Sequence, residues 1–454
     1  MKNFSTLDKT ASAVILFCTA LIGLVVFLGT QAGVRVKANL PERGLIGPYQ
    51  VVTLIFSESV DPQMAESLFD IQPKIDGTFR WADSQTMQFA SLQPFELGTA
   101  YKLTLRSGLL SQNDHELKTD QSWEMHVREP EIAYLKSGDG QSGVWTMSLN
   151  NTNPPRQLTD PSLKVIDFDA SRDGEFVIFI VQNQAGGIDL WRATRDGVSS
   201  ILLDCGLDRC TSPSISPDGT RVAYSREIAG PSIDLPYGSP RIWMLDMSEA
   251  KDGPVYQDQQ VLGYHPQWSP DGMQLASYDG LADQIRLLNV DSGQQFIFQS
   301  QTGGPMTWSP DGTKFLFTDV EQSEGGVRTR VRMADLTINK TFTLTGSEDD
   351  MDYGYNSLAW SPEDDESVLL GMRAGGDDPS QVFWLFNPGR LDGVIVAGQP
   401  EYAYTSPHWD VWGGAFVFQQ FKLKGPYKPE IGLWKQGSAE PLVVGEGLMP
   451  RWLP

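Results

Sequence analysis

Short apolar segments alternate with polar turns along most of the chain, and one turn pattern recurs. In Trp308–Thr318, WSPDGTKFLFT, a Ser-Pro-Asp-Gly turn is followed by a mostly apolar run. Proline fixes φ at about −65°, aspartate hydrogen-bonds nearby backbone, and glycine accepts the positive φ that ends the turn. The pattern predicts a β-hairpin whose leading tryptophan packs against a neighbouring layer.

This hairpin pattern returns along the chain. Clear copies lie at 213–219 and 266–272, a third at 358–362, and two degraded copies at 165–174 and 407–414. The residues that form the complete turns are Pro217, Asp218, Gly219, Pro270, Asp271, Gly272, Pro310, Asp311 and Gly312. A second recurring strand follows each hairpin, at 188–191, 242–245, 285–288, 331–333, 382–385 and 431–434. Repetition with a period of about 40 to 50 residues is typical of radial or solenoid folds.

The two ends of the repeat region complement each other. An early strand at 144–147 has no hairpin before it, whereas the final residues, Pro450–Pro454, match Pro266–Pro270. If the C-terminal segment adds the inner strand to the sheet begun by residues 131–150, no blade keeps an unpaired edge. The count predicts a seven-bladed β-propeller over residues 131–454. An ordinary β-sandwich is disfavoured because it would not repeat one turn with matching flanks.

The repeated W-S-P-D-G unit resembles the WD40-like (PD40-type) repeat of TolB-like β-propellers, over residues 131–454. The resemblance implies a binding platform for proteins, peptides or envelope polymers that uses loops around a central channel. Two copies depart from the Asp-Gly pattern, at Glu363–Glu366 and Val411–Gly414. We therefore expect the two blades that contain them to be less regular than the others.

Residues 33–130 contain short segments in which apolar and polar residues alternate, such as 51–56, 86–89 and 101–105, and turn residues separate them. This spacing predicts a β-sandwich. The features at 54–62, 69–73 and 77–81 resemble SbsA-type bacterial Ig-like domains, which implies a spacer or adhesive module. The predicted fold class is therefore all-β: a seven-bladed propeller and an Ig-like sandwich, with one N-terminal transmembrane helix.

A run without charges covers Ala11–Gly29. As a helix it would extend roughly 28 Å, close to the hydrocarbon thickness of a bilayer. We expect a short tail at residues 1–10 and an uncleaved anchor at 11–32; a signal peptide is the alternative. The bulk of the chain is then placed outside the cytoplasm, in the cell envelope.

The net charge is −22, from 35 basic and 57 acidic residues, which argues against a nucleic-acid partner. Beyond the apolar run, the cysteines are Cys205 and Cys210. In an oxidising compartment a local disulfide is favoured; two free thiols and a metal pair are the alternatives.

Two sets of residues raise the question of a binding site. The recurring tryptophans are interpreted as anchors between blades rather than as a sugar-binding platform: Trp268, Trp308, Trp360, Trp409 and Trp452. His265 and His408 flank such tryptophans, and their surroundings suggest equivalent positions in nonadjacent blades. We interpret them as packing or hydrogen-bonding residues, with a shared metal as the alternative.

Acidic loops at Ser347–Asp352, Glu363–Glu366 and Gly375–Asp378 carry oxygen ligands suited to Ca²⁺, but none has EF-hand spacing. No catalytic motif and no cofactor-binding motif is found. We therefore expect a non-catalytic binding or scaffold protein without a cofactor, whose partner is an envelope protein, peptide or polysaccharide.

Two other functions stay open. A metal-dependent enzyme acting on glycan or peptide would bring His265, His408 and carboxylates together at the channel mouth, and a structural surface component would self-associate. Three irregular insertions, at 228–240, 320–326 and 422–429, are candidates for binding specificity.

Overall fold

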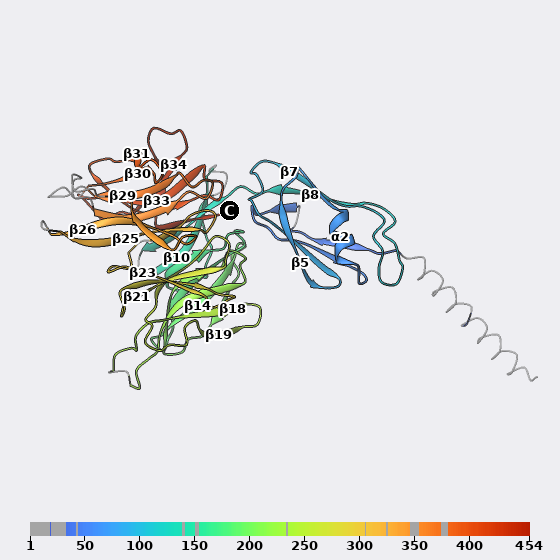
Figure 1. Ribbon diagram of the computed structural model, residues 1–454, viewed down its shortest axis with the longest axis horizontal. Helices are drawn as coiled ribbons and strands as arrows, with labels where there is room; N and C mark the ends of the chain where they lie inside the picture. The colour runs from blue at the N-terminus through green and yellow to red at the C-terminus, as the bar shows by residue number, and fades with distance from the viewer. Residues whose placement is uncertain are drawn as a thin grey trace, which may run out of the picture. The chain divides into compact units, whose positions relative to one another are not determined.

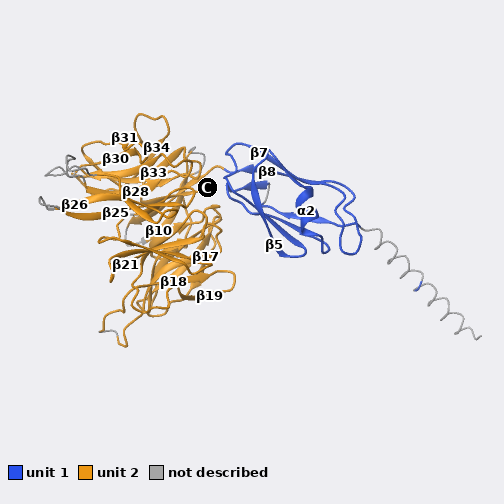
Figure 2. Cartoon of the chain, in the orientation of Figure 1, with its two compact units in different colours: residues 1–128 blue, residues 129–454 orange. Residues whose placement is uncertain are grey.

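The structure is a computed structural model that describes Thr19 and residues 33–41, 44–138, 141–149, 154–232, 235–304, 306–323, 326–345, 354–373 and 380–454. The chain divides into unit 1 (Met1–Arg128) and unit 2 (Glu129–Pro454), as Figure 2 shows. In these described ranges no helix is long and apolar enough to cross a membrane. The predicted anchor, residues 11–32, lies outside the described ranges except for Thr19.

Within residues 33–128, the described part of unit 1 consists mainly of short strands and includes helix α2 (Figure 1). Its elements are β1 (Val36–Asn39), β2 (Leu45–Ile46), β3 (Val52–Phe56), α2 (Pro62–Leu68), β4 (Phe69–Gln72), β5 (Gly77–Asp83), β6 (Thr86–Ser91), β7 (Ala100–Leu105) and β8 (Gln121–Val127). They form two four-stranded sheets, β1-β3-β6-β5 and β2-β8-β7-β4. The buried side chains of β3 and β7 alternate with more exposed ones, as expected for strands that cover a core on one face.

Helix α2 was not predicted from the sequence. Asp61 caps it, since its side chain accepts a hydrogen bond from the Met64 backbone N–H at 2.8 Å, and Pro62 begins the helix. An aspartate followed by proline is a usual helix start, so this signal was present in the sequence.

Unit 2 contains the repeated strands. Their bounds are β9 (Glu131–Gly138), β10 (Gln141–Ser148), β11 (Arg156–Gln157), β12 (Val165–Ala170), β13 (Phe176–Gln182), β14 (Ile188–Thr194), β15 (Ser199–Leu203), β16 (Arg209–Ile215), β17 (Arg221–Glu227), β18 (Arg241–Asp246), β19 (Lys251–Pro254), β20 (Tyr264–Trp268), β21 (Gln274–Asp279), β22 (Gln284–Asn289), β23 (Gln295–Gln299), β24 (Met306–Trp308), β25 (Lys314–Ser323), β26 (Gly326–Asp335), β27 (Lys340–Thr343), β28 (Gly354–Trp360), β29 (Val368–Arg373), β30 (Gln381–Asn387), β31 (Asp392–Ala397), β32 (Tyr402–Trp409), β33 (Ala415–Lys422), β34 (Glu430–Lys435), β35 (Leu442–Glu446) and β36 (Leu448–Leu453).

These strands form four-stranded sheets in chain order. β20–β23, β24–β27, β28–β31 and β32–β35 are separate sheets, and β12–β15 join β16–β19 through one parallel bridge between Ile188 and Arg209. The remaining sheet has the order β11-β10-β9-β36, so the last strand of the chain pairs with the first strand of unit 2.

The sheets pack side by side in a closed ring. We call β12, β16, β20, β24, β28, β32 and β36 the inner strands. Contacts join β36 to β12, β12 to β16, β16 to β20, β24 to β28, β28 to β32, and β32 to β36. The sheet of β20–β23 meets that of β24–β27 through a buried cluster in which Leu287 and Phe298 pack with Trp308 and Phe317. This closed ring is the arrangement of a β-propeller.

The three predicted insertions share one topological position. Each connects the second and third strands of its sheet: β17 to β18, β25 to β26, and β33 to β34. Because successive strands reverse direction, these connections lie on one face of the ring. The insertion at 320–326 is only partly irregular, since β25 and β26 remain paired as far as Ser323 and Gly326. The prediction of an irregular segment was therefore wrong for residues 320–323 and 326, which belong to β25 and β26.

Candidate functional site: the central channel of unit 2

The inner strands break their pairing at corresponding places. Register shifts occur in β12, β16, β20, β28, β32 and β36. In four of these strands a residue with positive φ lies directly before a proline: Ser212 (51°), His265 (49°), Ser406 (53°) and Met449 (50°). Proline has no N–H to donate, and a bulge turns the following side chains in a new direction. The bulges therefore change the direction of the side chains that follow them in these strands.

One residue of each inner strand, directly before the tryptophan position, forms what we call the inner ring: Asp169, Ser214, Gln267, Thr307, Ala359, His408 and Arg451. All of these except Ala359 line a single cavity of about 870 Å³, to which every inner strand contributes. We call this cavity the channel. Residues far apart in the sequence thus share one site because the sheets close into a ring.

The titratable side chains of the inner ring are concentrated on one side. His408, Arg451 and Asp169 lie on β32, β36 and β12, which follow one another around the ring, while the other members are uncharged. Burial raises the pKa of Asp169 and of nearby Asp167, and the positive charge of Arg451 opposes this rise. One carboxylate oxygen of Asp169 also accepts a hydrogen bond from the Ile215 backbone N–H at 2.9 Å.

His408 is held neutral. Burial, and then the positive charge of Arg451, lower the pKa of His408 to about 3. Its Nδ1 atom is buried and has no hydrogen-bond partner in the described part of the chain. At neutral pH the imidazole of His408 is therefore uncharged, and it lies in the channel with the cation Arg451 and the carboxyl group of Asp169.

The tryptophans lie between neighbouring sheets, each 3–8% exposed. The indole N–H of Trp268 donates to the Ser214 carbonyl at 3.1 Å, that of Trp409 to Ala359 at 3.1 Å, and that of Trp452 to His408 at 3.0 Å. Every one of these acceptors belongs to the inner ring of the preceding sheet. The tryptophans thus position the channel residues and offer little free surface for stacking on a sugar.

The repeated turns lie at one end of the inner strands. In the three complete copies the serine hydroxyl donates to the turn aspartate at 2.5–2.6 Å. The turn glycines have φ of 69–72°. Pro217 and Pro270 also line the channel, and the Arg172 guanidinium donates to the Pro270 carbonyl at 2.9 Å across this end.

The two channel histidines do not occupy equivalent positions, which corrects the interpretation from the sequence. His265 lies in the bulge before Pro266 and is exposed, whereas His408 follows Pro407 and pairs with Val417. Both line the channel, together with Asp169. Within the described ranges no group of three or more His, Cys, Asp or Glu residues is arranged to hold a metal ion.

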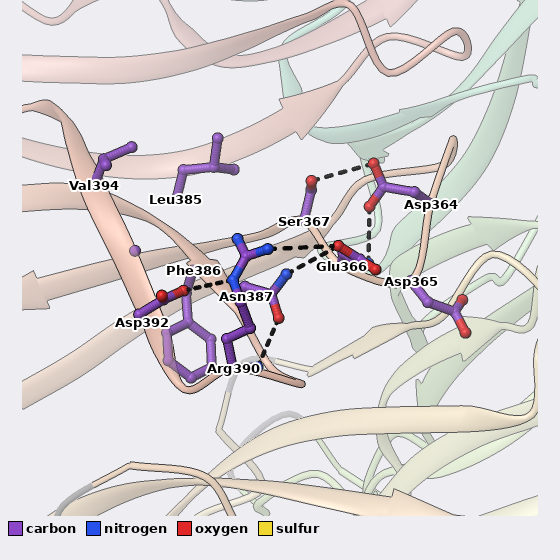
Figure 3. A pocket seen from close by; sticks show the side chains of 11 residues that line it. Asp364, Asp365, Glu366, Ser367, Leu385, Phe386, Asn387, Arg390, Asp392 and Val394 are labelled. Atoms are coloured by element: carbon purple, nitrogen blue, oxygen red, sulfur yellow. Dashed lines mark hydrogen bonds and ion pairs between the residues drawn. The ribbon is translucent and has the colours of Figure 1, made fainter.

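Of the acidic loops, Ser347–Asp352 and Gly375–Asp378 fall outside the described residues. Glu363–Glu366 borders a hollow of about 610 Å³ beside β30 and β31, drawn in Figure 3. Its carboxylates are bonded to protein groups: Asp365 contacts Lys314 at 2.9 Å, and Glu366 accepts a hydrogen bond from Asn387 at 3.2 Å. The oxygen atoms are therefore not gathered around one point as in a Ca²⁺ loop.

The cysteines lie at the junction of β15 and β16, away from the inner ring. Cys205 and Cys210 are joined by a disulfide, with Cα atoms 6.5 Å apart, and both are buried. The Cys205 backbone N–H donates to the buried carboxylate of Asp189 at 2.9 Å. This loop is thereby fixed at the parallel bridge between two sheets.

The sequence analysis missed three charged residues that line the channel: Asp169, Arg172 and Arg451. An alignment of the repeats on their tryptophan position could have found three residues of the inner ring. Asp169, His408 and Arg451 each lie directly before that position in their repeat.

Comparison with known proteins gives a sequence match over part of the chain and several matches in fold. No family model matches the sequence. A curated relative, the Protein TolB homolog of Chlorobium luteolum, is 27% identical over 147 residues, which cover 32% of this chain and 31% of that protein. The match therefore spans about a third of the length of the relative.

Solved structures show likeness in fold. A structure from a study of two prolyl endopeptidases has a TM-score of 0.51 and 14% identity, covering 70% of this chain and 50% of that one. TolB from Acinetobacter baumannii has a TM-score of 0.43 at 14% identity, covering 85% and 83%, and the β-propeller domain of the Trilobed protease from Pyrococcus furiosus has 0.46 at 12%, covering 62% and 83%. The chain is thus an all-β protein that is similar to a TolB homolog in sequence over about a third of its length, and to the prolyl endopeptidase structure in fold.

Proposed function

We propose that the chain is a non-catalytic binding or scaffold protein. Unit 2 acts as a seven-bladed propeller closed by β36, and its channel holds an extended segment of an envelope protein, a peptide or a polysaccharide. The observation that carries this proposal is the channel itself, to which every inner strand contributes a side chain and all of them except β28 contribute a polar one. A site built from many separate strands suits a ligand that makes several contacts along its length.

The inner ring favours a segment with both polar and carboxylate groups. Arg451 can pair with a carboxylate, while Ser214, Gln267 and Thr307 on the opposite side offer hydrogen-bond donors and acceptors. The adjoining Asp169 disfavours a strongly anionic ligand such as nucleic acid, in agreement with the net charge of −22.

We also propose an extracytoplasmic location, with residues 11–32 as a single-pass membrane anchor and residues 33–130 as an Ig-like spacer. The uncharged apolar run in the sequence and the Cys205–Cys210 disulfide support this placement. No cofactor is required by the proposal.

Photo-crosslinking in the cell tests the binding function. A photoreactive amino acid is placed at Gln267 or Thr307 in the channel, and at Ile201, which is 49% exposed on the outer strand β15. We expect one partner to crosslink reproducibly from the channel positions and not from Ile201. Ser214→Trp, which fills the channel, should abolish this crosslink. Equal capture from all positions, or no channel-specific product, would contradict the proposal.

A second candidate function is an enzyme acting on glycan or peptide. Its supporting observation is that His265, His408 and Asp169 line the same cavity. Incubation of the purified protein with glycan and peptide libraries, with and without added divalent metals, tests this function. Turnover that is lost in both His408→Gln and Asp169→Asn would favour the enzyme over the binding protein. A structural surface component would instead show self-association of the full chain by light scattering.

A further inference from the structure

We propose that the outer edge of β31, with the hollow beside it, binds an extended basic segment of a partner protein by strand addition. This site is separate from the channel and does not depend on the proposed function. Its occupant is a segment in which lysine or arginine alternates with aliphatic residues.

The outer edge of β31 is open in the described structure. β31 pairs only with β30 among the described strands, and its first four residues, Asp392 to Ile395, are all exposed. Val394 is 62% exposed and Ile395 is 63% exposed. Proteins usually protect such an edge with lysine, proline or a covering loop, and β31 contains neither lysine nor proline. The unpaired N–H and C=O groups of this edge can therefore pair with an added strand.

The hollow next to this edge has two kinds of lining. Leu385, Phe386 and Val394 form its apolar part, and the acidic side chains come from the turn that precedes β29 and from Asp392 (Figure 3). Figure 3 shows Val394 and Leu385 apart from the group formed by Asp364, Asp365 and Glu366. Alternate side chains of an added strand point to opposite faces, so one set can reach the hollow.

The charge of the hollow determines the partner. Asp364, Asp365, Glu366 and Asp392 are four carboxylates, and the cations in contact with them are Arg390 and Lys314. Arg390 lies 3.1 Å from Asp392 and 3.9 Å from Glu366, while Lys314 contacts Asp365. Negative charge therefore exceeds positive charge here, and a basic segment complements it.

Another outer strand supplies a matched control. β35 also exposes two aliphatic side chains, Leu442 (65%) and Val443 (56%). The acidic hollow lies along β31 and not along β35. A partner selected only by exposed aliphatic residues would bind both strands, whereas a partner selected by charge as well would bind β31.

Binding of a designed peptide to the full chain tests the proposal. The probe has about ten residues in which lysine alternates with valine, and its control has glutamate in place of lysine. We expect the basic peptide to bind with an affinity that falls as salt is raised, and the acidic peptide not to bind. Hydrogen–deuterium exchange should then slow in residues 392–397 and remain unchanged in 442–446.

Two substitutions locate the binding edge. Val394→Lys introduces a like charge and should weaken basic-peptide binding by about tenfold or more, whereas Val443→Lys should leave it within about twofold. Binding that is equally sensitive to both substitutions, or equal for both peptides, would overturn the proposal. Concentration-dependent dimerisation lost in Val394→Lys would also overturn it, because the edge would then serve a second copy of the chain.

Discussion

Single residues of the inner strands both build the ring and face the channel. Trp452 illustrates the first role, since it is 3% exposed and its indole N–H bonds to the carbonyl of His408. Trp308 occupies the corresponding position and is 5% exposed, but its indole nitrogen has no partner in the described residues. Two similar side chains therefore differ in one hydrogen bond.

This difference predicts unequal costs for the same substitution. Trp→Phe removes ring volume at both positions but removes a hydrogen bond only at Trp452. We expect Trp452→Phe to lower the free energy of unfolding by about 1 kcal/mol more than Trp308→Phe. Urea denaturation of the two variants measures this difference. Equal losses would show that the hydrogen bond to His408 contributes no net stability.

Asp410 illustrates how burial disfavours a charge. It replaces the serine found in the complete turns, and burial raises its pKa to about 6 although backbone N–H groups oppose the shift. The folded protein therefore binds a proton more readily than the unfolded chain. The stability that Asp410 contributes is present below its ordinary pKa of 3.8 and is lost as pH rises through about 6.

Asp410→Asn should accordingly increase the free energy of unfolding at pH 7, by about 1–2 kcal/mol, and should have little effect at pH 4. The asparagine carbonyl can still accept the hydrogen bond from the Gly414 N–H. Asp218→Asn is the matched control, for which the expected change in the free energy of unfolding at pH 7 has the opposite sign. Burial raises the pKa of Asp218, but hydrogen bonds from Ser216 and Thr220 lower it overall, so this variant should be destabilised at pH 7. Denaturation at both pH values distinguishes the two.

At the scale of elements, the repeated turn fixes where each inner strand ends and the next strand begins. Gly272 has φ of 72°, and a Cβ there would lie 3.4 Å from the nearest atom, in the ring of Pro217. The site therefore has nearly enough room for a methyl group, and the main obstacle to a side chain is the backbone conformation.

Gly272→Ala should lower the free energy of unfolding by about 1 kcal/mol, since alanine is strained at this φ. Gly253 on β19 has no positive φ and open space around it, so Gly253→Ala is the control and should be neutral or slightly stabilising. Thermal denaturation of both proteins checks the comparison. A larger loss in Gly253→Ala would contradict the assignment of strain to the turn.

At the scale of the whole molecule, ring closure depends on β36. Leu453 is fully buried and pairs with Glu131 of β9, in a cluster that also contains Val177 and Phe179 of the following sheet. Arg195 strengthens the same junction by donating to the carbonyl oxygens of Gly174, Leu453 and Pro454 at 2.7–3.2 Å. The sheet that contains both β9 and β36 and the following sheet, β12–β15, are thus held by one continuous core.

Leu453→Asp should destabilise unit 2 by at least about 3 kcal/mol, because a carboxylate would be buried without a partner. Leu442→Asp is the control: Leu442 is 65% exposed on β35, and its replacement should change stability by less than about 0.5 kcal/mol. Limited proteolysis of the two variants, read by mass spectrometry, reports whether unit 2 opens. Equal resistance would show that the β36 junction is not required for a closed ring.

Much of the fold follows from local sequence. The Pro-Asp-Gly turns and the apolar segments after them predict strands at 188–191, 242–245 and 285–288, and the structure has β14, β18 and β22 there. The match between 450–454 and 266–270 predicts that the last strand joins the first sheet, because equal patterns occupy equal places in a repeat. Helix α2 and the extended β25–β26 hairpin were not predicted, since neither belongs to the repeat.

The sequence by itself determined the all-β class, the repeated hairpin and the buried tryptophans, because these depend on turn chemistry and on alternation within a few residues. Only the tertiary structure decided which polar residues share the channel. Asp169 and Arg451 lie near opposite ends of unit 2 in the sequence, and they meet because β36 closes the ring beside β12. The bulges changed which side chains share a face of the inner strands, since a shift in register changes side-chain direction in a way that strand periodicity does not reveal.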